Sequence, residues 1–379
     1  MERVKSLLKP LEDDTAILVG RRKEMFPYED ELRHHLNCLG VLELSDRLVW
    51  VPFSRIQNVT FLAQGGFSKV WKARIKLRKG GVVQQVVLKE LDKSAIQQVL
   101  LSTILSSQSS MVTSEIYGLS RLPDSETYLL VAQYLQGGSL EDWFKIPLHK
   151  GQPTWRHVLT MALELALGLF NIHDLGLTHS DLHPRNIIPG SLSAPKMSVI
   201  DIGLAKAIGI SQYDDNQGYY GRLQYLPPEV FHGYPYTQAS DVYCFGTMFW
   251  LIASHVPPRG TAAKLFRADR MREESVPDMP REMERIICDC WNPNPEGRPT
   301  IDEVIQRMLK IQYVMEETRR DLQFSENTKR FWAERRKEYL EALAAEEKDD
   351  GFGFFNGGNS RLYAQSQYFT HQQLTAFIY

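Results

Sequence analysis

The 379-residue chain is poor in cysteine. Its four cysteines form neither a disulfide framework nor a zinc-binding spacing; they are Cys38, Cys244, Cys288 and Cys290. The pair Cys288 and Cys290 falls in an apolar helical pattern, which favours buried thiols over metal ligands. This cysteine usage indicates a reducing compartment, and we expect a cytoplasmic protein.

The sequence also lacks a strong excess of charge and a long apolar run. Its formal net charge of −2 gives no reason to expect nucleic acid or an anionic membrane as a partner. The longest apolar stretch, Val158–Phe170, is interrupted by Glu164 and is too short to span a bilayer. No apolar signal segment begins the sequence, so we expect no membrane segment. With 43% apolar and 24% charged residues, the composition is that of a globular protein with a real core.

Residues 179–203 carry the clearest chemical pattern. Asp181 is followed five residues later by Asn186, and Asp201-Ile202-Gly203 comes after an apolar pair. Phosphoryl transfer needs a carboxylate that orients the attacking hydroxyl and hard oxygen ligands that hold magnesium against the phosphates. Asp181 fits the first role, and Asn186 and Asp201 fit the second. Alone, the same residues would equally fit a polar turn between two buried strands.

Two further stretches precede this pattern. Apolar residues alternate on both sides of Gly65-Gly66, which predicts a strand, a turn and a second strand over Phe61–Ala73. A later apolar run, Val86-Val87-Leu88, ends at Lys89. A lysine in such a place is usually a strand edge, but its position between the glycine pair and Asp181 favours a functional role.

Together these motifs resemble a eukaryotic-type protein kinase domain, over about two-thirds of the chain. The catalytic loop reads His179-Ser180-Asp181, and the metal-binding triplet reads Asp201-Ile202-Gly203. The Cys-Trp start of the last motif at Cys290 and the Asp-Leu-His of the catalytic loop are most similar to the tyrosine-kinase-like group. The resemblance implies a two-lobe α+β fold, with an antiparallel five-stranded small lobe, a mainly helical large lobe, and ATP with Mg²⁺ as cofactors.

The resemblance also assigns site residues. Asp181 is the expected base, Lys89 the phosphate anchor, and Asn186 and Asp201 the metal ligands, with Asn186 also counted as catalytic. The nucleotide is expected to contact the glycine-rich loop, the strands around it and the hinge, through Leu62, Gly65, Gly66, Ser68, Val70, Val87, Lys89, Gln133, Leu135 and Ile188.

Further motifs predict the frame of the large lobe. Tyr128–Gln133 reads as a buried strand that leads to the hinge, with the small residue Ala132 gating the pocket behind adenine. Ser139 is expected to cap a short helix. Helices are expected over Trp155–His173 and from Ser240 through Ile252.

Three polar residues complete this frame by resemblance. Asp241 should tie down the backbone of the catalytic loop. Arg298 should form a buried ion pair with Glu229, which ends the activation segment as Pro227-Pro228-Glu229.

The pattern departs from the family at several places. The helix expected over Ser94–Ser107 should carry a glutamate that pairs Lys89, yet no acidic residue lies between Asp92 and Glu115. Ala63 and Ser68 replace two glycines of the loop, and Ser180 replaces the arginine before the catalytic aspartate. These changes keep open the alternative of a pseudokinase scaffold that binds nucleotide without efficient transfer.

A small-molecule phosphotransferase also uses a His-x-Asp motif with a later asparagine. The activation segment, Asp241 and Arg298 favour a protein substrate instead. The sequence leaves Ser/Thr against Tyr preference, substrate identity and oligomeric state open.

The chain divides into five expected regions. They are an N-terminal extension over 1–50 with short helices at Lys5–Leu11 and Tyr28–Leu39, a small lobe over 51–135, a large lobe over 136–312, a helix within 313–348, and a disordered tail over 349–379. The pair His34-His35 reads as a solvated helix face because no further ligand lies at metal-binding spacing.

Overall fold

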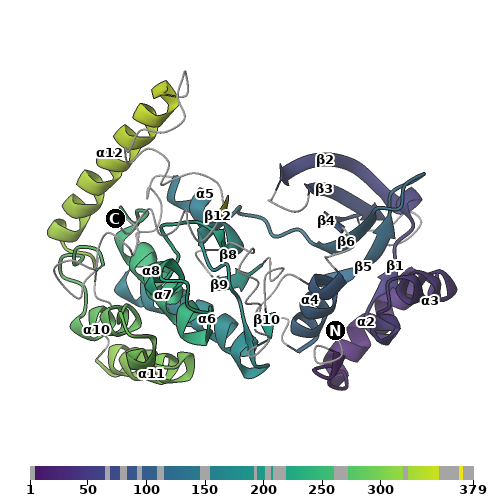
Figure 1. The fold of residues 1–379 in the computed structure, drawn as a ribbon, viewed down its shortest axis with the longest axis horizontal. Coiled ribbons are helices and arrows are strands. Elements are labelled where there is room, and N and C mark those ends of the chain that lie inside the picture. Colours follow the sequence, from purple (N-terminus) through teal and green to yellow (C-terminus); the bar gives the residue numbers. More distant parts are fainter. Residues whose placement is uncertain are drawn as a thin grey trace. The chain divides into compact units, whose positions relative to one another are not determined.

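A computed structural model of the chain describes residues 5–64, 69–76, 83–91, 96–108, 115–145, 154–191, 194–200, 206–207, 219–259, 272–318, 323–349 and 367–369. The chain divides into two compact units (Figure 1). The first unit comprises residues 1–136 and 198–205, and the second comprises residues 137–197 and 206–379.

The first unit is built on a mixed sheet. Among the described residues it has six strands in the order β1-β5-β6-β4-β3-β2. Their bounds are β1 Val49–Trp50, β2 Ile56–Gln64, β3 Lys69–Lys76, β4 Val83–Leu91, β5 Ile116–Arg121 and β6 Tyr128–Gln133. The prediction of five antiparallel strands is therefore wrong by one strand. The extra strand, β1, pairs in parallel with β5 through Val49↔Gly118 and Trp50↔Leu119.

Helices precede this sheet, but not all where the sequence pattern placed them. α2 spans Asp13–Met25 and α3 spans Glu29–Cys38, followed by the 3-10 turns η1 Leu42–Asp46 and η2 Phe53–Arg55. The helix expected over Lys5–Leu11 is not formed, because the backbone from Ser6 to Leu11 is turn or irregular. Pro10 lies inside that range, where a helix interior tolerates proline poorly. α2 begins beyond it, with acids in its first turn and Arg22 and Lys23 in its last.

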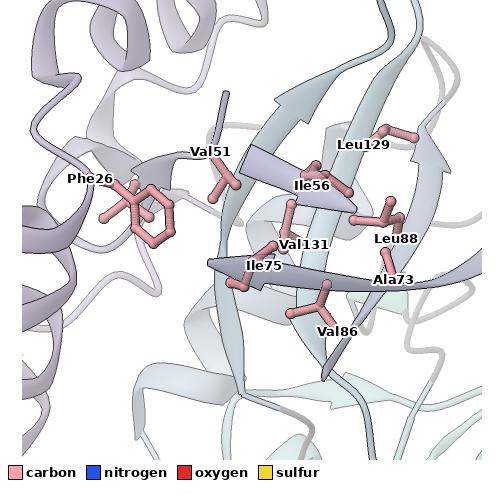
Figure 2. Close-up of a cluster of buried hydrophobic side chains, with 10 residues drawn as sticks. Phe26, Val51, Ile56, Ala73, Ile75, Val86, Leu88, Leu129 and Val131 are labelled. Atoms are coloured by element: carbon pink, nitrogen blue, oxygen red, sulfur yellow. The ribbon is translucent and has the colours of Figure 1, made fainter. Parts of the chain in front are cut away.

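The segment before the sheet contributes directly to the core of the first unit. Phe26, which follows α2, and Val51, which follows β1, are buried with Ile75 and Val131 of the sheet (Figure 2). Phe26 and Val51 are 3% and 0% exposed, respectively. Burial of this extent stabilises by about 1.5–3 kcal/mol per large apolar side chain. Removing the segment is therefore expected to open the core of the first unit.

α4, Ile96–Gln108, provides the helix predicted after Lys89. Val99, Leu100 and Ile104 are almost fully buried. Its C-terminal end is bound by polar contacts: the Arg47 guanidinium donates to Ser107 Oγ at 2.6 Å, and the Ile116 N–H donates to Ser106 Oγ at 3.1 Å.

The second unit is mainly helical. Its helices are α5 Leu140–Lys145, α6 Trp155–Asp174, α7 Pro228–Phe231, α8 Gln238–Ser254, α10 Arg281–Cys290, α11 Ile301–Glu317 and α12 Glu326–Asp349, with 3-10 turns η4 Pro184–Asn186 and η6 Pro295–Gly297. The predicted strand Tyr128–Gln133 and the helices predicted from Trp155 and from Ser240 are confirmed. Ser139 caps α5, since its Oγ accepts from the Asp142 N–H at 3.3 Å. α8 is the centre of this unit, because every residue from Ser240 to Ser254 is buried.

Short strand pairs follow, and all of their residues except the last two of β9 belong to the second unit. β7 Leu177–Thr178 pairs with β10 Lys206–Ala207, and β8 Ile187–Ser191 pairs with β9 Ala194–Val199. β11 Tyr219–Gly221 pairs with β12 Gln367–Phe369. The expectation of a disordered tail is therefore not met at these three residues, while most of the remaining tail lies outside the described residues.

The C-terminal helical region differs in detail from the single helix expected within 313–348. Its first residues belong to the end of α11, and α12 begins only at Glu326. Trp332 of α12 is buried, as its helical spacing suggests. Within the described part of the chain, no helix combines the length and apolar character that a membrane crossing requires.

Candidate active site

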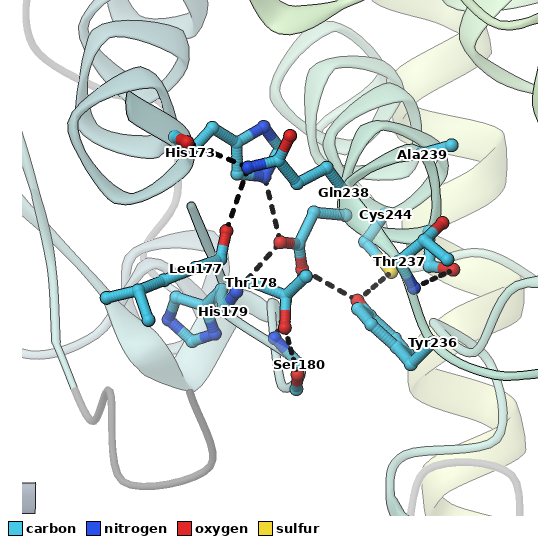
Figure 3. Close-up of polar contacts among 12 residues, drawn as sticks. His173, Leu177, Thr178, His179, Ser180, Tyr236, Thr237, Gln238, Ala239 and Cys244 are labelled. Carbon is cyan, nitrogen blue, oxygen red and sulfur yellow. Dashed lines mark hydrogen bonds and ion pairs between the residues drawn. The ribbon is translucent and has the colours of Figure 1, made fainter. Parts of the chain in front are cut away.

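The stretch that carries Asp181 runs from β7 to η4, and its backbone is bound by the carboxylate of Asp241. Figure 3 labels the partners of that carboxylate, which are His173, His179, Ser180 and Tyr236. Asp241 lies in the first turn of α8 and is 0% exposed. It accepts hydrogen bonds from the backbone N–H groups of His179 at 2.7 Å and Ser180 at 3.1 Å. The prediction that Asp241 ties down the loop backbone is confirmed.

The same carboxylate has two side-chain partners. His173 Nε2 lies 2.9 Å from Asp241 Oδ2, and the Tyr236 hydroxyl donates to Oδ1 at 2.8 Å. Burial by itself would raise the pKa of Asp241, but the hydrogen bond and charge of His173 outweigh it, so the pKa is lowered. The group stays ionised at neutral pH. An ionised acceptor makes each of these bonds stronger than a neutral one.

This anchoring holds an unusual backbone conformation. Ser180, which replaces the expected arginine, has a φ of 67°, in the left-handed region that non-glycine residues rarely adopt. Its N–H bonds to Asp241, and its hydroxyl lies 2.9 Å from that of Thr178. The two bonds therefore hold a turn that presents the next residue, Asp181.

Asp181 and Asn186 are brought together. The Asn186 amide nitrogen donates to the Asp181 carbonyl oxygen at 2.8 Å and to the carboxylate oxygen Oδ2 at 3.2 Å. His183 Nε2 also approaches Asp181 Oδ2, at 3.5 Å. The Asp181 side chain is only 9% exposed, so few orientations are open to it. Asp181 is thus a carboxylate held by its own loop.

Asn186 fits the metal role expected of it. Within the described part of the chain, both side-chain bonds of Asn186 use the amide nitrogen, which leaves the amide oxygen for a cation. Amide and carboxylate oxygens are the ligands that Mg²⁺ prefers. The second expected ligand, Asp201, lies outside the described residues, as do Gly65, Gly66 and Ser68 of the glycine-rich loop.

In the first unit, Lys89 lies on β4, opposite Val70 of β3 and Leu130 of β6. Val86 and Leu88 are buried in the core, whereas Val87 and Lys89 are half-buried, as alternation along a strand requires. The opposite face of β4 therefore carries both predicted nucleotide residues. On the neighbouring strand β6, Ala132 pairs with Val87; Ala132 is the small residue expected to gate the pocket behind adenine.

The other described residues that are predicted to contact the nucleotide lie in strands or in the linker that follows β6. Leu62 lies in β2 and is 45% exposed. Gln133 ends β6 and its N–H donates to the Glu115 carbonyl at 2.8 Å. Leu135 follows it and is half-buried, and Ile188 lies in β8 of the second unit.

No acid is available from α4, whose sequence IQQVLLSTILSSQ is uncharged. Glu115, which lies beyond α4, forms an ion pair with Arg22 of α2. The Arg22 guanidinium also lies 5.0 Å from the centre of the Tyr117 ring. Burial, followed by the charge of Glu115, raises the pKa of Tyr117 to about 12. Because Glu115 pairs with Arg22, this geometry agrees with the expectation that Glu115 is not the ion-pair partner of Lys89.

The end of the activation segment is fixed by a buried ion pair. Arg298 donates from Nη1 to Glu229 Oε1 at 2.8 Å and from Nη2 to Oε2 at 2.7 Å. The arginine side chain is 0% exposed and the glutamate side chain 6%. Ser240 of α8 adds a third bond to Glu229, at 2.6 Å. The predicted pair is confirmed, with the bidentate geometry that suits guanidinium and carboxylate.

One charged cluster was missed by sequence reasoning. Glu141 of α5 contacts Arg185 of η4 and accepts from Arg222 Nη1 at 2.6 Å. Arg222 is 4% exposed, and its Nε and Nη2 atoms have no partner within the described part of the chain. Burial by itself would raise the pKa of Glu141, but the charges and hydrogen bonds of Arg222 and Arg185 outweigh burial, so the pKa is lowered. No sequence signal connects residues so far apart, so only the fold reveals the cluster.

Comparison with known proteins agrees with this geometry. Residues 56–308 match the family model described as protein tyrosine and serine/threonine kinase. Relatives include a dual specificity protein kinase, shkA, of Dictyostelium discoideum, 25% identical over 283 residues, which are 73% of this chain and 51% of the relative. Human mitogen-activated protein kinase kinase kinase 7 is 23% identical, over 69% of this chain and 42% of its own length.

A mouse protein named inactive tyrosine-protein kinase 7 is also similar, 24% identical over 67% of this chain and 25% of its own. The chain thus spans about half or less of the length of these relatives. The match of the family model to two-thirds of the sequence agrees with the loop, the anchoring aspartate and the buried ion pair seen in the structure. The chain belongs to the protein tyrosine and serine/threonine kinase family.

Proposed function

We propose that this protein is an ATP-dependent protein kinase that transfers the γ-phosphate to a hydroxyl of a protein substrate. The observation that carries the proposal is the arrangement of Asp181 and Asn186 in a loop bound to Asp241. The side-chain amide of Asn186 donates hydrogen bonds to Asp181 at 2.8 and 3.2 Å. A carboxylate held in this way is preorganised to orient a hydroxyl, so little reorganisation is needed on reaction.

Each residue has a distinct role in the proposed reaction. Asp181 accepts a hydrogen bond from the substrate hydroxyl and takes its proton while the hydroxyl oxygen bonds to the γ-phosphorus. The bond from that phosphorus to the β,γ-bridging oxygen breaks in the same step, and ADP is the leaving group. His183, at 3.5 Å from the same carboxylate, restricts its rotation. Lys89 would bind the nucleotide phosphates, and Asn186 and Asp201 would hold Mg²⁺, which when bound would offset negative charge on the phosphates. The proposed nucleotide contacts are Leu62, Val70, Val87, Gln133, Leu135 and Ile188, together with Gly65, Gly66 and Ser68 of the glycine-rich loop.

The organisation of the chain forms part of the same proposal. The small lobe comprises residues 51–135 and the large lobe residues 136–312, with the extension, the 313–348 region and the tail outside them. A role in cytoplasmic signalling is supported by four cysteines that are all free thiols. The acceptor is a protein, and the net charge of −2 favours no nucleic-acid partner.

The test is a magnesium-ATP assay of the purified protein on a degenerate peptide library, with the variant Asp181→Asn beside it. Asparagine keeps the shape of the side chain but cannot take the proton. Transfer should fall by about 10²–10⁴-fold, the usual contribution of such a group. ATP binding, measured by calorimetry, should survive, and the phosphorylated residues identify the hydroxyl preference.

Asp174→Asn is the matched control, because Asp174 is exposed at the end of α6. Its turnover should equal that of the parent. ATP binding without transfer in the parent protein would instead identify a pseudokinase, the outcome that the uncharged α4 would explain.

A further inference from the structure

Two segments far apart in the sequence form a strand pair in the second unit. β11, Tyr219–Gly221, lies in the activation segment. β12, Gln367–Phe369, which is labelled in Figure 1, lies near the C-terminus. They pair antiparallel with the register Tyr219↔Phe369, Tyr220↔Tyr368 and Gly221↔Gln367. Within the described residues, β12 is the sole strand partner of β11.

The position of β11 connects this pair to the candidate catalytic loop. Arg222, directly after β11, binds Glu141, which also contacts Arg185 of η4. Three residues further, the Tyr225 ring lies 6.3 Å from that of His183, whose Nε2 is 3.5 Å from Asp181. An extended segment paired with β11 therefore lies beside the residues that contact the catalytic loop.

The pairing needs only backbone groups. A strand with an unpaired edge offers N–H and C=O groups to which the backbone of an extended peptide can form hydrogen bonds. Many proteins bind peptides by this addition of a strand. A two-stranded pair of three residues is marginal by itself. Its stability comes in part from both strands belonging to one chain, because binding is then intramolecular. We therefore expect the pair to form within one chain and to be displaceable by a competing extended peptide.

We propose that β11 is a docking edge for an extended peptide, and that the chain's own C-terminal segment around Gln367–Phe369 occupies it in cis. The segment thereby competes with peptide substrates for the approach to Asp181. This inference rests on the proposed kinase function for its catalytic consequence, but the docking itself is independent of activity.

The docking is tested by proline substitution in the full-length protein. Which N–H groups of β12 bond to β11 depends on the alternation of an antiparallel pair. Replacing Gln367, Tyr368 and Phe369 together by proline removes every N–H donor of β12 and so destabilises the pair, and the N–H groups of β11 then lose the β12 carbonyls that protect them from exchange. The matched control carries proline at Gln372, Gln373 and Leu374, outside the paired residues. Hydrogen exchange followed by mass spectrometry then measures the amides of Tyr219–Gly221.

Protection at Tyr219–Gly221 should be lost in the 367–369 variant and retained in the control. It should also be independent of protein concentration, since the pair forms within one chain. Equal protection in both variants overturns the proposal, because β11 would then not depend on β12. Protection that grows with protein concentration also overturns it, in favour of pairing between two copies.

The catalytic consequence is tested separately, with the KM for a peptide substrate taken from the library screen. If the tail occupies the edge for 70–90% of the time, its release lowers the apparent KM by roughly three- to tenfold. The control should keep the parent KM. An unchanged KM with lost protection refutes the competition, whereas absence of transfer in every variant, with protection changed as expected, refutes the kinase function alone.

Discussion

At its first turn, helix α8 presents the buried carboxylate of Asp241 to the catalytic loop, whereas at its last turn it ends against aromatic rings. At the first turn the contacts are hydrogen bonds with fixed directions, and they determine the backbone of His179 and Ser180. A negative charge is also favoured there by the partial positive charge of a helix N-terminus.

The other end of α8 uses ring packing. His255 is the C-cap, with a φ of 56°, and its ring lies 4.4 Å from that of Trp332 in α12. Trp332 also donates from Nε1 to the Ala253 carbonyl at 3.0 Å and packs against Phe324 at 4.5 Å. A cation at a helix C-terminus would be favoured, yet burial and the charge of Arg336 lower the pKa of His255 to about 3.

The contrast between the two ends of α8 shows where buried charge is useful in this unit. Asp241 places backbone atoms that precede Asp181, and that task needs directional bonds. His255 and Trp332 join the end of α8 to α12 and to the rings of Phe144 and Phe324, and for that task neutral packing suffices. Changes at the first end should therefore affect stability and transfer together, whereas changes at the second should affect stability alone.

The largest effect is expected from Asp241→Ala. The change leaves two loop N–H groups, the Tyr236 hydroxyl and His173 without their acceptor. Removing one partner of a buried charged network costs about 3–5 kcal/mol. Urea unfolding followed by tryptophan fluorescence measures this, and peptide phosphorylation should fall as well.

Asp289→Ala is its control. Asp289 accepts a hydrogen bond from Arg307 at 2.8 Å, but the Asp289 side chain is 53% exposed. Exposed pairs contribute about 0–1 kcal/mol, so this variant should stay close to the parent. Equal losses in the two variants would contradict the role given to Asp241.

Trp332→Ala, at the other end of α8, is expected to lower the free energy of unfolding by about 3 kcal/mol. The change removes an indole that is 8% exposed and its bond to Ala253. Trp332→Phe keeps an aromatic ring and should lose less than half as much. Since neither variant touches the loop, the turnover of the folded protein at low temperature should match the parent. A turnover loss like that of Asp241→Ala would erase the distinction between the two ends.

The titration of His255 should change the free energy of unfolding by about 1 kcal/mol as the pH falls below neutrality. Its folded-state pKa of about 3 lies below the ordinary 6.5, so the unfolded chain binds the proton more readily. Stability from this group is present above pH 6.5 and is lost as the pH falls towards the folded-state value. Unfolding free energies at pH 7.5 and 5.5 should differ by this amount more in the parent than in His255→Asn, because asparagine tolerates a positive φ. Identical differences in both proteins would show that other groups titrate.

The sequence predicts most accurately the side-chain roles that belong to short motifs. Asp241, Glu229 and Arg298 lie in recognisable motifs, and the structure confirms their bonds. Their roles depend on chemistry that few residue types supply, namely an ionised acceptor for two N–H groups and a bidentate pair. The roles given to Asp181, Asn186 and Lys89 stay predictions.

Other features depend on contacts that no local pattern encodes. β1 has two residues and exists because Val49 and Trp50 meet β5, some seventy residues later. β12 likewise depends on β11, and the Glu141 cluster draws on three separate elements. His255 would pass for a surface histidine, since only the fold encloses its Nε2 atom.

A smaller effect than that of Asp241→Ala or Trp332→Ala is expected from Gln238→Ala, beside Asp241 at the first end of α8. The Gln238 amide donates to the His173 carbonyl at 2.8 Å and the Leu177 carbonyl at 3.1 Å. These bonds are neutral, and the His173 carbonyl also accepts from the Gly176 N–H at 2.9 Å. The loss should therefore be about 1 kcal/mol, less than two full bonds to buried acceptors. If urea unfolding gives a loss as large as that of Asp241→Ala, the first end is held by its neutral bonds, and the charge of Asp241 is not what fixes the loop.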